Sequence, residues 1–192
     1  MLKISNNQRV WLISDIHFNH NKDFLYGDRG FDTVHNMNNQ LLKNFKETIN
    51  YNDIVFILGD NWLGDLNEGW ALFQQVPGIK YLIRGNHDTD TRWDFLTEKS
   101  ILNPFINILG EAATVKIHGY LFFLSHYPTA TTNFNDYEKP LQHRVLNISG
   151  HTHSTEKWQK DVPSSYNVSL EAHNLCPVNI DTIISDFKEK YK

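Results

Sequence analysis

Short apolar runs recur along the chain, and each is rich in β-branched and aromatic side chains. Runs of about five residues with this composition are typical of buried strands. The predicted strands are Val10–Ser14, Ile54–Leu58, Ile79–Ile83, Thr114–Ile117, Tyr120–Ser125, Val145–Ser149 and Tyr166–Leu170. The pair His118-Gly119 lies between two of these runs and predicts a tight hairpin turn.

Helical patterns separate several of these strands. One apolar stripe follows a capping residue at Asp32 or Thr33 and consists of Val34, Met37, Leu41, Phe45 and Ile49. Further helices are indicated by Trp70, Phe73 and Val76, by Phe95 and Leu96, and after Asp181 by Ile183, Ile184, Phe187 and Tyr191. Strands that first alternate with helices and then form hairpins favour an α/β fold with mixed sheets.

The length of 192 residues fits one domain, which at this size buries roughly 70% of the surface of the unfolded chain. The predicted elements use most of that length. We therefore expect a single domain over residues 1–192 without a separate cap domain. Five Trp, eight Tyr and twelve Phe argue against disorder.

Charge and composition exclude several kinds of partner. With 18 Lys and Arg against 22 Asp and Glu, the net charge of −4 predicts no tight, non-specific binding of duplex nucleic acid.

Cys176 is the only cysteine, so no intrachain disulfide can form. Residues 1–10 lack the apolar segment of a signal peptide, and no apolar run reaches the roughly 18 residues of a membrane span. We expect a cytoplasmic protein with no membrane partner.

Residues with metal-binding side chains come directly after five of the predicted strands. They are Asp15, His17, Asp60, Asn86, His126, His151 and His153. In open α/β sheets, ligands bind at the carboxyl ends of the strands. Asp15 and His17 are two residues apart, so on an extended segment both side chains would point to the same side, and His151 and His153 repeat this spacing.

The chemistry of this set indicates divalent metal ions. Carboxylate, imidazole and amide oxygen together suit Mn²⁺, Fe, Zn²⁺ or Ni²⁺ better than Ca²⁺. Seven ligands exceed what one ion needs, so we expect two ions, with Mn²⁺ as the leading candidate and Asp60 as a possible bridge. Each motif alone is weak evidence, since Asp-x-His occurs by chance and Gly-Asn-His-Asp also suits a turn. The combination, with every motif after a strand, predicts a metal site.

The series D-x-H, G-D, G-N-H-D, H and G-H-x-H between Asp15 and His153 resembles the calcineurin-like metallophosphoesterase superfamily. Phe18-Asn19-His20, Arg29 and the tail with Cys176-Pro177-Val178 resemble small single-domain members from bacteria and phages, although Asn19 replaces a Gly. The resemblance implies an α/β fold in which two mixed sheets, flanked by helices, form a four-layer α-β-β-α sandwich.

The resemblance also implies how the ligands are shared. One ion would be held by Asp15, His17, Asp60 and His153. The other would be held by Asp60, Asn86, His126 and His151. His87 would stand beside the metals as a general acid or a transition-state stabiliser, oriented by Asp88.

The predicted function is hydrolysis of a small or exposed phosphoester by hydroxide generated at the two metal ions. A phosphodiester is favoured because only Arg29 and Arg84 are obvious candidates to hold the dianion of a monoester. His20 is a further candidate for contact with substrate. The alternatives are a phosphomonoesterase acting on nucleotides or proteins, a non-catalytic scaffold on the same fold, and a nucleotide-binding module.

Two polar segments that contain aromatic residues are the expected sites of substrate recognition. They are residues 18–31 and 127–143, and both follow predicted ligands. Loops at strand ends commonly carry specificity. Phe134, Tyr137 and Arg29 are the candidates within them to stack on a base or to hold a second phosphate.

Overall fold

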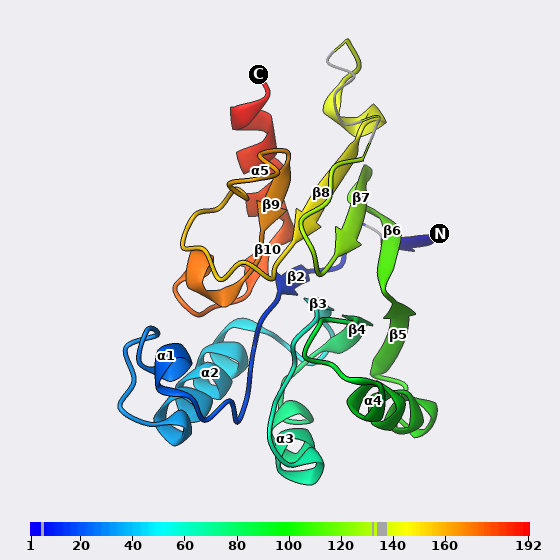
Figure 1. Ribbon diagram of the computed structural model, residues 1–192. Helices are drawn as coiled ribbons and strands as arrows, with labels where there is room; N and C mark the ends of the chain where they lie inside the picture. Colours follow the sequence, from blue (N-terminus) through cyan, green and yellow to red (C-terminus); the bar gives the residue numbers. More distant parts are fainter. Residues whose placement is uncertain (5, 132, 134–137) are drawn as a thin grey trace.

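The computed structural model describes residues 1–4, 6–131, 133 and 138–192, so Phe134 and Tyr137 lie outside the described residues. Two five-stranded sheets face each other (Figure 1). The first sheet has the order β10 (Val178–Asn179), β2 (Val10–Ile13), β3 (Ile54–Leu58), β4 (Ile79–Ile83) and β5 (Ile106–Gly110). The second has the order β1 (Leu2–Ile4), β6 (Ala112–Ile117), β7 (Tyr120–Ser125), β8 (Val145–Ser149) and β9 (Ser165–Asn167).

Both sheets are mixed, as predicted. In the first sheet β2, β3, β4 and β5 run parallel, and only β10 is antiparallel to its neighbour. In the second, β7, β8 and β9 run parallel, while β6 pairs antiparallel with β7 through the predicted turn at His118 and Gly119. The carboxyl ends of the parallel strands therefore meet at one edge of each sheet, and this is where a ligand site is expected.

The helices are α1 (Asp23–Tyr26), α2 (Val34–Thr48), α3 (Leu66–Phe73), α4 (Asp90–Leu102) and α5 (Ile180–Lys190), with 3-10 turns at Leu141–His143 and Leu170–His173. Three helices begin at a capping side chain that accepts a backbone N–H of the first turn. These caps are Thr33 for α2, Asp65 for α3 and Asn179 for α5. None of the described helices is long and apolar enough to cross a membrane.

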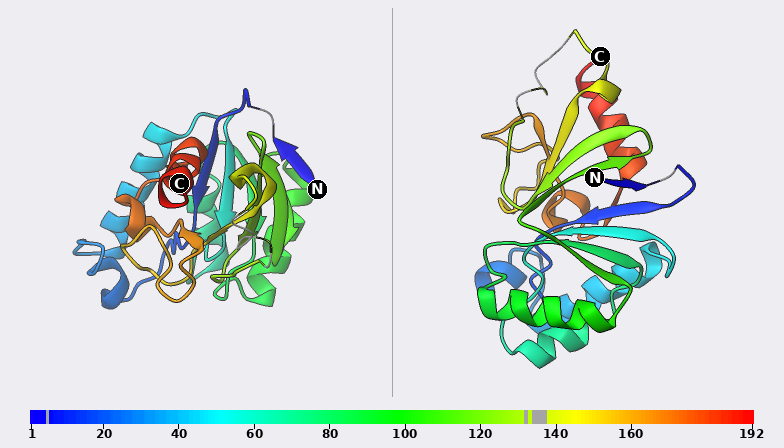
Figure 2. Two further views of the ribbon diagram at one scale, coloured as in Figure 1. Left: turned by 90° about the horizontal axis from the view of Figure 1, so that it is seen from above. Right: turned by 90° about the vertical axis from the view of Figure 1, so that its right-hand side faces the viewer.

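Two cores hold the layers together. The first lies between the two sheets and includes Phe56 and Phe122 from their facing sides, together with Phe187 of α5. The second lies between the other face of the first sheet and helices α1 to α4, and includes Phe45 and Leu82. Figure 2 shows these four helices gathered on one side of the sheets. The predicted sandwich of two mixed sheets flanked by helices is confirmed.

The differences from the predicted elements concern short or half-buried strands. The strand predicted over Tyr166–Leu170 ends at Asn167, because Leu170 begins a 3-10 turn. Strands β1, β5 and β10 were not predicted. Two of them are only two or three residues long, and β5 is half-buried, so their pairing depends on neighbours distant in sequence rather than on a local apolar pattern.

Candidate metal centre

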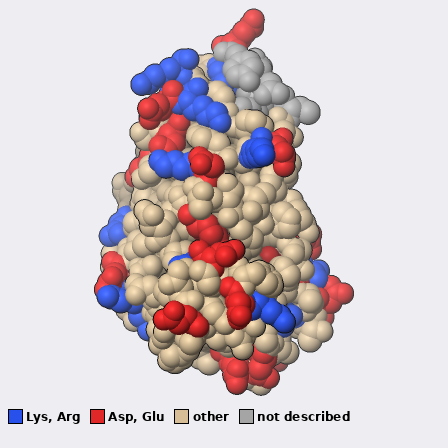
Figure 3. Space-filling view, turned by 60° about the vertical axis from the view of Figure 1, so that its left-hand side comes forward, with Lys and Arg blue, Asp and Glu red and all other residues tan. Residues whose placement is uncertain are grey.

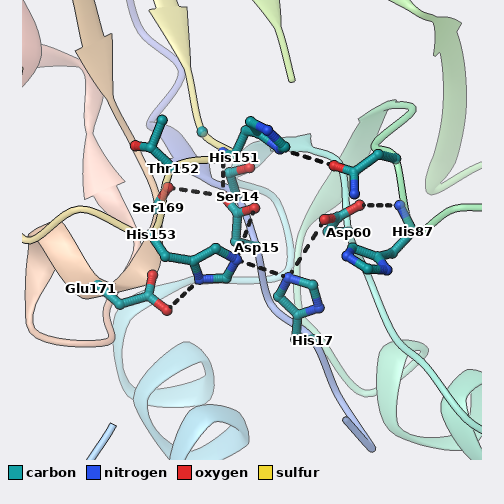
Figure 4. Close-up of polar contacts among 12 residues, drawn as sticks. Ser14, Asp15, His17, Asp60, His87, His151, Thr152, His153, Ser169 and Glu171 are labelled. Carbon is teal, nitrogen blue, oxygen red and sulfur yellow. Dashed lines mark hydrogen bonds and ion pairs between the residues drawn. The ribbon is translucent and has the colours of Figure 1, made fainter. Parts of the chain in front are cut away.

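All seven predicted ligands meet between the two sheets, at the carboxyl ends of β2, β3, β4, β7 and β8. Figure 4 shows five of them, Asp15, His17, Asp60, His151 and His153. Asp15, His17 and His153 form one group whose ligand atoms lie within 4.8 Å of one another. Asp15, Asp60 and His126 form a second such group. Asn86 and His151 belong beside the second group, because Oδ1 of Asn86 lies 2.7 Å from Nε2 of His126 and 2.9 Å from Nδ1 of His151.

The backbone at five of these ligands lies in the left-handed region. The φ angles are 60° at Asp15, 55° at His17, 59° at Asp60, 74° at His151 and 50° at His153. Residues other than glycine rarely adopt this conformation, and it gathers at functional sites. The expectation that Asp15 and His17, or His151 and His153, lie on extended segments is therefore wrong. Their side chains converge because the chain turns sharply at each ligand as it leaves the sheet.

The glycines of the motifs leave the space into which the ligands fit. A Cβ atom on Gly85 would lie 2.2 Å from Oδ1 of Asp60. A Cβ atom on Gly150 would lie 2.1 Å from Oγ of Ser14 and 2.4 Å from Oδ2 of Asp15. Both distances are far below van der Waals contact. These two glycines are needed for close approach of the loops rather than for a left-handed backbone.

The donor set of the second group fits a cation. Nδ1 of His126 lies 2.8 Å from the carbonyl oxygen of Leu58, which can only accept, so Nδ1 carries the proton of the neutral ring. Nε2 of His126 then presents a lone pair to Oδ1 of Asn86 at 2.7 Å and to Oδ2 of Asp60 at 3.6 Å. Acceptors that face one another are unfavourable unless a cation lies among them.

The first group shows the same arrangement. Nδ1 of His153 lies 2.8 Å from Oε1 of Glu171, so this nitrogen donates and Nε2 keeps the lone pair. Nε2 of His153 is 3.2 Å from Nε2 of His17 and 3.7 Å from Oδ1 of Asp15. That Asp15 oxygen is buried and has no hydrogen-bond partner among the described residues. The residues present therefore fit a second cation.

Asp60 lies between the two groups. Its Oδ2 is 3.5 Å from Nε2 of His17 and 3.6 Å from Nε2 of His126, while its Oδ1 accepts the backbone N–H of His87 at 2.8 Å. Burial raises the pKa of this carboxyl to about 6. One buried carboxylate oxygen is thus equally close to an imidazole of each group.

Burial keeps two of the ligand imidazoles in the neutral form that binds a metal. Burial, followed by the charges of His153 and Arg29, lowers the pKa of His17 well below its usual value. Burial and His126 also lower the pKa of His151. For His153, burial lowers the pKa, but the hydrogen bond to Glu171 and the charge of Asp15 outweigh it and leave the pKa raised. Neutral imidazole is the form that coordinates metals, so burial prepares His17 and His151 for that role.

Arg29 was predicted to contact substrate, but in this structure its side chain is buried and its guanidinium is bonded to protein groups. Its side chain is only 1% exposed. The guanidinium donates to the carbonyl oxygens of Ile16 at 2.9 Å and Asp15 at 2.6 Å, and to Oε1 of Glu171 at 2.7 and 2.9 Å. The left-handed turns after β2 leave these carbonyls without partners from secondary structure, and Arg29 supplies the donors they need.

Arg84 is also committed to protein groups. It donates to the backbone carbonyl of Asp88 at 2.8 Å and forms ion pairs with Asp90 and Glu111. These contacts tie its guanidinium to the segment after β4 and to Glu111, and contact with the phosphate of a substrate stays a prediction.

Asp88 does not orient His87 as predicted. Its carboxylate accepts the backbone N–H of Asp60 at 2.9 Å, of Gly85 at 2.9 Å and of Asn61 at 3.2 Å, and also the side-chain amide of Asn61. These four hydrogen bonds use its acceptor capacity. Asp88 instead fastens the loop that carries Asp60 to the loop that carries Asn86.

His20 and His87 face a pocket of about 440 Å³ beside the ligands. Its lining also includes His17, His153 and the exposed Phe24. The ring centroid of His87 lies 5.3 Å from that of His17 and 6.0 Å from that of His20. Burial, followed by the charge of His87, lowers the pKa of His20. Among the described residues, His20 is a predicted substrate contact that lines this pocket.

Two residues that support the ligands were not predicted from the sequence, Glu171 and Ser169. Glu171 holds His153, and Oγ of Ser169 donates to Oδ2 of Asp15 at 2.9 Å. Glu171 comes directly after the predicted strand Tyr166–Leu170, just as Asp15 and His126 come directly after theirs. The strand-end rule that found the ligands could therefore have found this carboxylate as well.

The fold and the site define a class of protein in which cation ligands gather at strand ends between two mixed sheets. Residues 8–189 match the calcineurin-like phosphoesterase family, and the chain belongs to it. The chain is 30% identical to the uncharacterized protein MJ1445 of Methanocaldococcus jannaschii over 182 residues, which cover 92% of this chain and 90% of the relative.

Two solved structures resemble this one. A protein of unknown function from Aquifex aeolicus, AQ665, superimposes with a TM-score of 0.65 at 24% identity, covering 93% of this chain and 99% of that one. This likeness supports the fold alone. A novel archaeal phosphodiesterase superimposes with a TM-score of 0.48 at 18% identity, over 83% and 82% of the two chains. A likeness this weak says nothing about the substrate.

Proposed function

We propose that the protein hydrolyses phosphodiesters with two divalent metal ions, of which Mn²⁺ is the leading candidate. The observation that carries the proposal is the position of Oδ2 of Asp60, 3.5 Å from His17 and 3.6 Å from His126, between two sets of lone pairs. One ion is assigned to Asp15, His17, Asp60 and His153. The other is assigned to Asp60, Asn86, His126 and His151. Asp60 would be shared by the two sets of ligands in this arrangement.

The chemistry divides between the ions and the protein. When bound, the two ions polarise the phosphoryl oxygens and lower the pKa of water so that it can act as the nucleophile. His87 faces the pocket beside the ligands and supplies a proton to the leaving oxygen. His20 and Phe24 line the same pocket and contact the leaving group. Asp88 and Arg29 keep the ligand loops in place through backbone hydrogen bonds.

The preference for a diester rests on the two arginines. A monoester carries two negative charges and is held best by additional cations, whereas a diester carries one. Arg29 is buried under the Asp15 loop, and Arg84 is paired with Asp90 and Glu111. Among the described residues that line the pocket, Arg29 is the only Lys or Arg. No free cation in the described part of the pocket is therefore placed to hold the second charge.

The surface supports a small or exposed substrate rather than long duplex nucleic acid. On the face shown in Figure 3, Lys and Arg side chains are scattered among Asp and Glu side chains, without a continuous basic patch among the described residues. Non-specific binding to duplex depends on many phosphate contacts from basic residues. The net charge of −4 points in the same direction.

Bis(p-nitrophenyl) phosphate and p-nitrophenyl phosphate test the proposal directly. Both are to be compared at matched pH with protein that has been stripped of metal and reloaded with Mn²⁺. We expect the diester to show the higher kcat/KM and the stripped protein to be inactive. If the monoester is preferred by about tenfold or more, a phosphatase is the better assignment.

A panel of other phosphoesters distinguishes the remaining alternatives. A non-catalytic scaffold or a nucleotide-binding module would bind metal or nucleotide but release no phosphate or alcohol from any ester. The presence of the His87 side chain beside a full ligand set supports an enzyme. Absence of turnover across the panel, with each of Mn²⁺, Fe²⁺, Zn²⁺ and Ni²⁺ restored in turn, would contradict it.

A further inference from the structure

A second pocket, also of about 440 Å³, lies at the other end of the first sheet from the metal centre. Its walls come from the segments that enter three neighbouring parallel strands. Tyr51 and Asn52 precede β3, residues 74–78 precede β4, and Asn103 and Phe105 precede β5. The pocket is therefore built at the amino ends of β3, β4 and β5. The opposite, carboxyl ends of β3 and β4 lead to the ligands Asp60 and Asn86.

Lys80 is the buried cation of this pocket. The residue is only 5% exposed and lies on β4, two positions from Leu82 and thus on the helix-covered face of the sheet. Its ammonium donates to the carbonyl oxygen of Gly78 at 3.0 Å, and the described residues show no further partner for it. An ammonium has three N–H donors, so two remain without a protein acceptor.

The rest of the lining is suited to an anion. Among the described residues that line the pocket there is no carboxylate, although the chain as a whole has a net charge of −4. Lys46 supplies a second ammonium, held at 3.0 Å by Oε1 of Gln75. Side-chain amides of Asn52 and Asn103 add neutral donors. A buried ammonium without a counter-charge is costly, and an anion bound beside it removes that cost.

Aromatic side chains at the pocket indicate that the anionic group belongs to a molecule that contains a ring. Phe105 is 52% exposed and Tyr51 is 83% exposed, and both line the pocket. Exposed aromatic rings around a few convergent polar groups are typical of sites for small organic molecules, and the volume is in the usual range for them. We propose that this pocket binds a small organic anion, in which a carboxylate or phosphate group contacts Lys80 and a ring packs against Phe105 and Tyr51.

The state of Lys80 agrees with this proposal. Burial lowers the pKa of its ammonium to about 8, and no neighbouring charge contributes to that shift. The site is separate from the metal centre, since β4 continues from Lys80 through Ile83 before it reaches the ligand Asn86. Binding here therefore does not depend on bound metal ions or on the reaction proposed for them.

NMR titration of the ¹⁵N-labelled protein, loaded with diamagnetic Zn²⁺ in place of Mn²⁺, tests the site. Benzoate and phenylphosphonate supply the two kinds of anion on the same ring, and benzamide is the uncharged control of the same shape. We expect both anions to shift the backbone amides of Gly78, Asn103 and Phe105, with the stronger binder identifying the anionic group. Benzamide should leave these amides unmoved.

Variants establish which residue binds the anion. Lys80→Met replaces the ammonium by an apolar chain of similar length and should weaken binding at least about tenfold, as expected for loss of a buried ion pair. Lys116→Met, on the exposed side of β6, is the matched control and should bind as the wild type does. In the wild type, bound benzoate should raise the pKa of Lys80, measured on its ¹⁵Nζ signal. The proposal is overturned if neither anion shifts these amides, if benzamide shifts them as benzoate does, or if Lys80→Met binds normally.

Discussion

Oε1 of Glu171 lies 2.8 Å from Nδ1 of His153, so a carboxylate outside the ligand set fixes the proton position of a metal-binding imidazole. The same oxygen accepts from Arg29 at 2.7 Å, and Arg29 in turn donates to the backbone of Asp15. Burial alone would raise the pKa of Glu171, but the hydrogen bond to His153 and the charge of Arg29 lower it to about 2. Glu171 is thus a positioning residue that couples two ligands.

The first prediction concerns this carboxylate. Glu171→Gln should weaken binding of the ion assigned to His153 by about 10–100-fold, because such outer partners orient and activate the ligand imidazole. Calorimetric titration of metal-free protein with Mn²⁺ would show one weakened site beside one unchanged site. Glu156→Gln, at an exposed position in the loop after His153, is the control. If both Mn²⁺ sites of Glu171→Gln bind as they do in the wild type, Glu171 does not position the ligand His153.

Asp60→Asn should weaken both metal sites at once and lower kcat by orders of magnitude. The physical reason is that one oxygen of Asp60 lies beside an imidazole of each group, and the amide of Asn is neutral. Elemental analysis after dialysis should find about two ions per chain in the wild type and fewer than one in the variant. Asp94→Asn, on the exposed side of α4, should match the wild type. A single ion in fully active wild-type protein would contradict the two-metal proposal.

His87→Ala should retain both metal ions and lose turnover by about 10²–10⁴-fold, the usual contribution of a general acid. The loss should be smaller for bis(p-nitrophenyl) phosphate than for a diester with an alkyl leaving group, because nitrophenolate leaves without a proton. The measurement is kcat on both substrates, with metal content determined for each preparation. Equal losses on the two substrates would show that His87 acts by electrostatics instead of proton transfer.

Lys80→Met should raise the free energy of unfolding at pH 7 by roughly 3 kcal/mol, since the pKa of Lys80 falls from 10.5 in the unfolded chain to about 8 on burial. The cost of burying the charge is present in full below pH 8 and disappears as pH rises toward 10.5. The difference between variant and wild type should therefore shrink over that interval. Urea unfolding from pH 7 to 10.5 measures it, with Lys116→Met as the control. A difference that does not change with pH would show that burial does not lower this pKa.

The meeting of the seven candidate ligands could be predicted because the signal that marks each of them is local in the sequence. Apolar runs that stop at Asp15, Asp60 or His126 mark both the end of a strand and the residue delivered there. Parallel neighbours in one sheet end at the same edge, so strand-end residues meet without any knowledge of the intervening chain. The glycines before Asp60 and His151 belong to the same local signal. Gly59 permits the turn with its positive φ, and Gly150 permits the close approach of the loops.

Tertiary structure decided the roles of the charged residues around the ligands. Arg29 and Glu171 are 142 residues apart, and their contact changed Arg29 from a predicted substrate contact into a support for the Asp15 loop. Asp88 pairs with the backbone of Asp60, 28 residues away, rather than with its neighbour His87. Lys80 appears in the sequence as an ordinary strand residue, and only packing of the helices over β4 buries its ammonium. The partners of a charged side chain are decided by the fold, because residues distant in sequence are brought next to it. The residue type at a position in the sequence does not specify those partners.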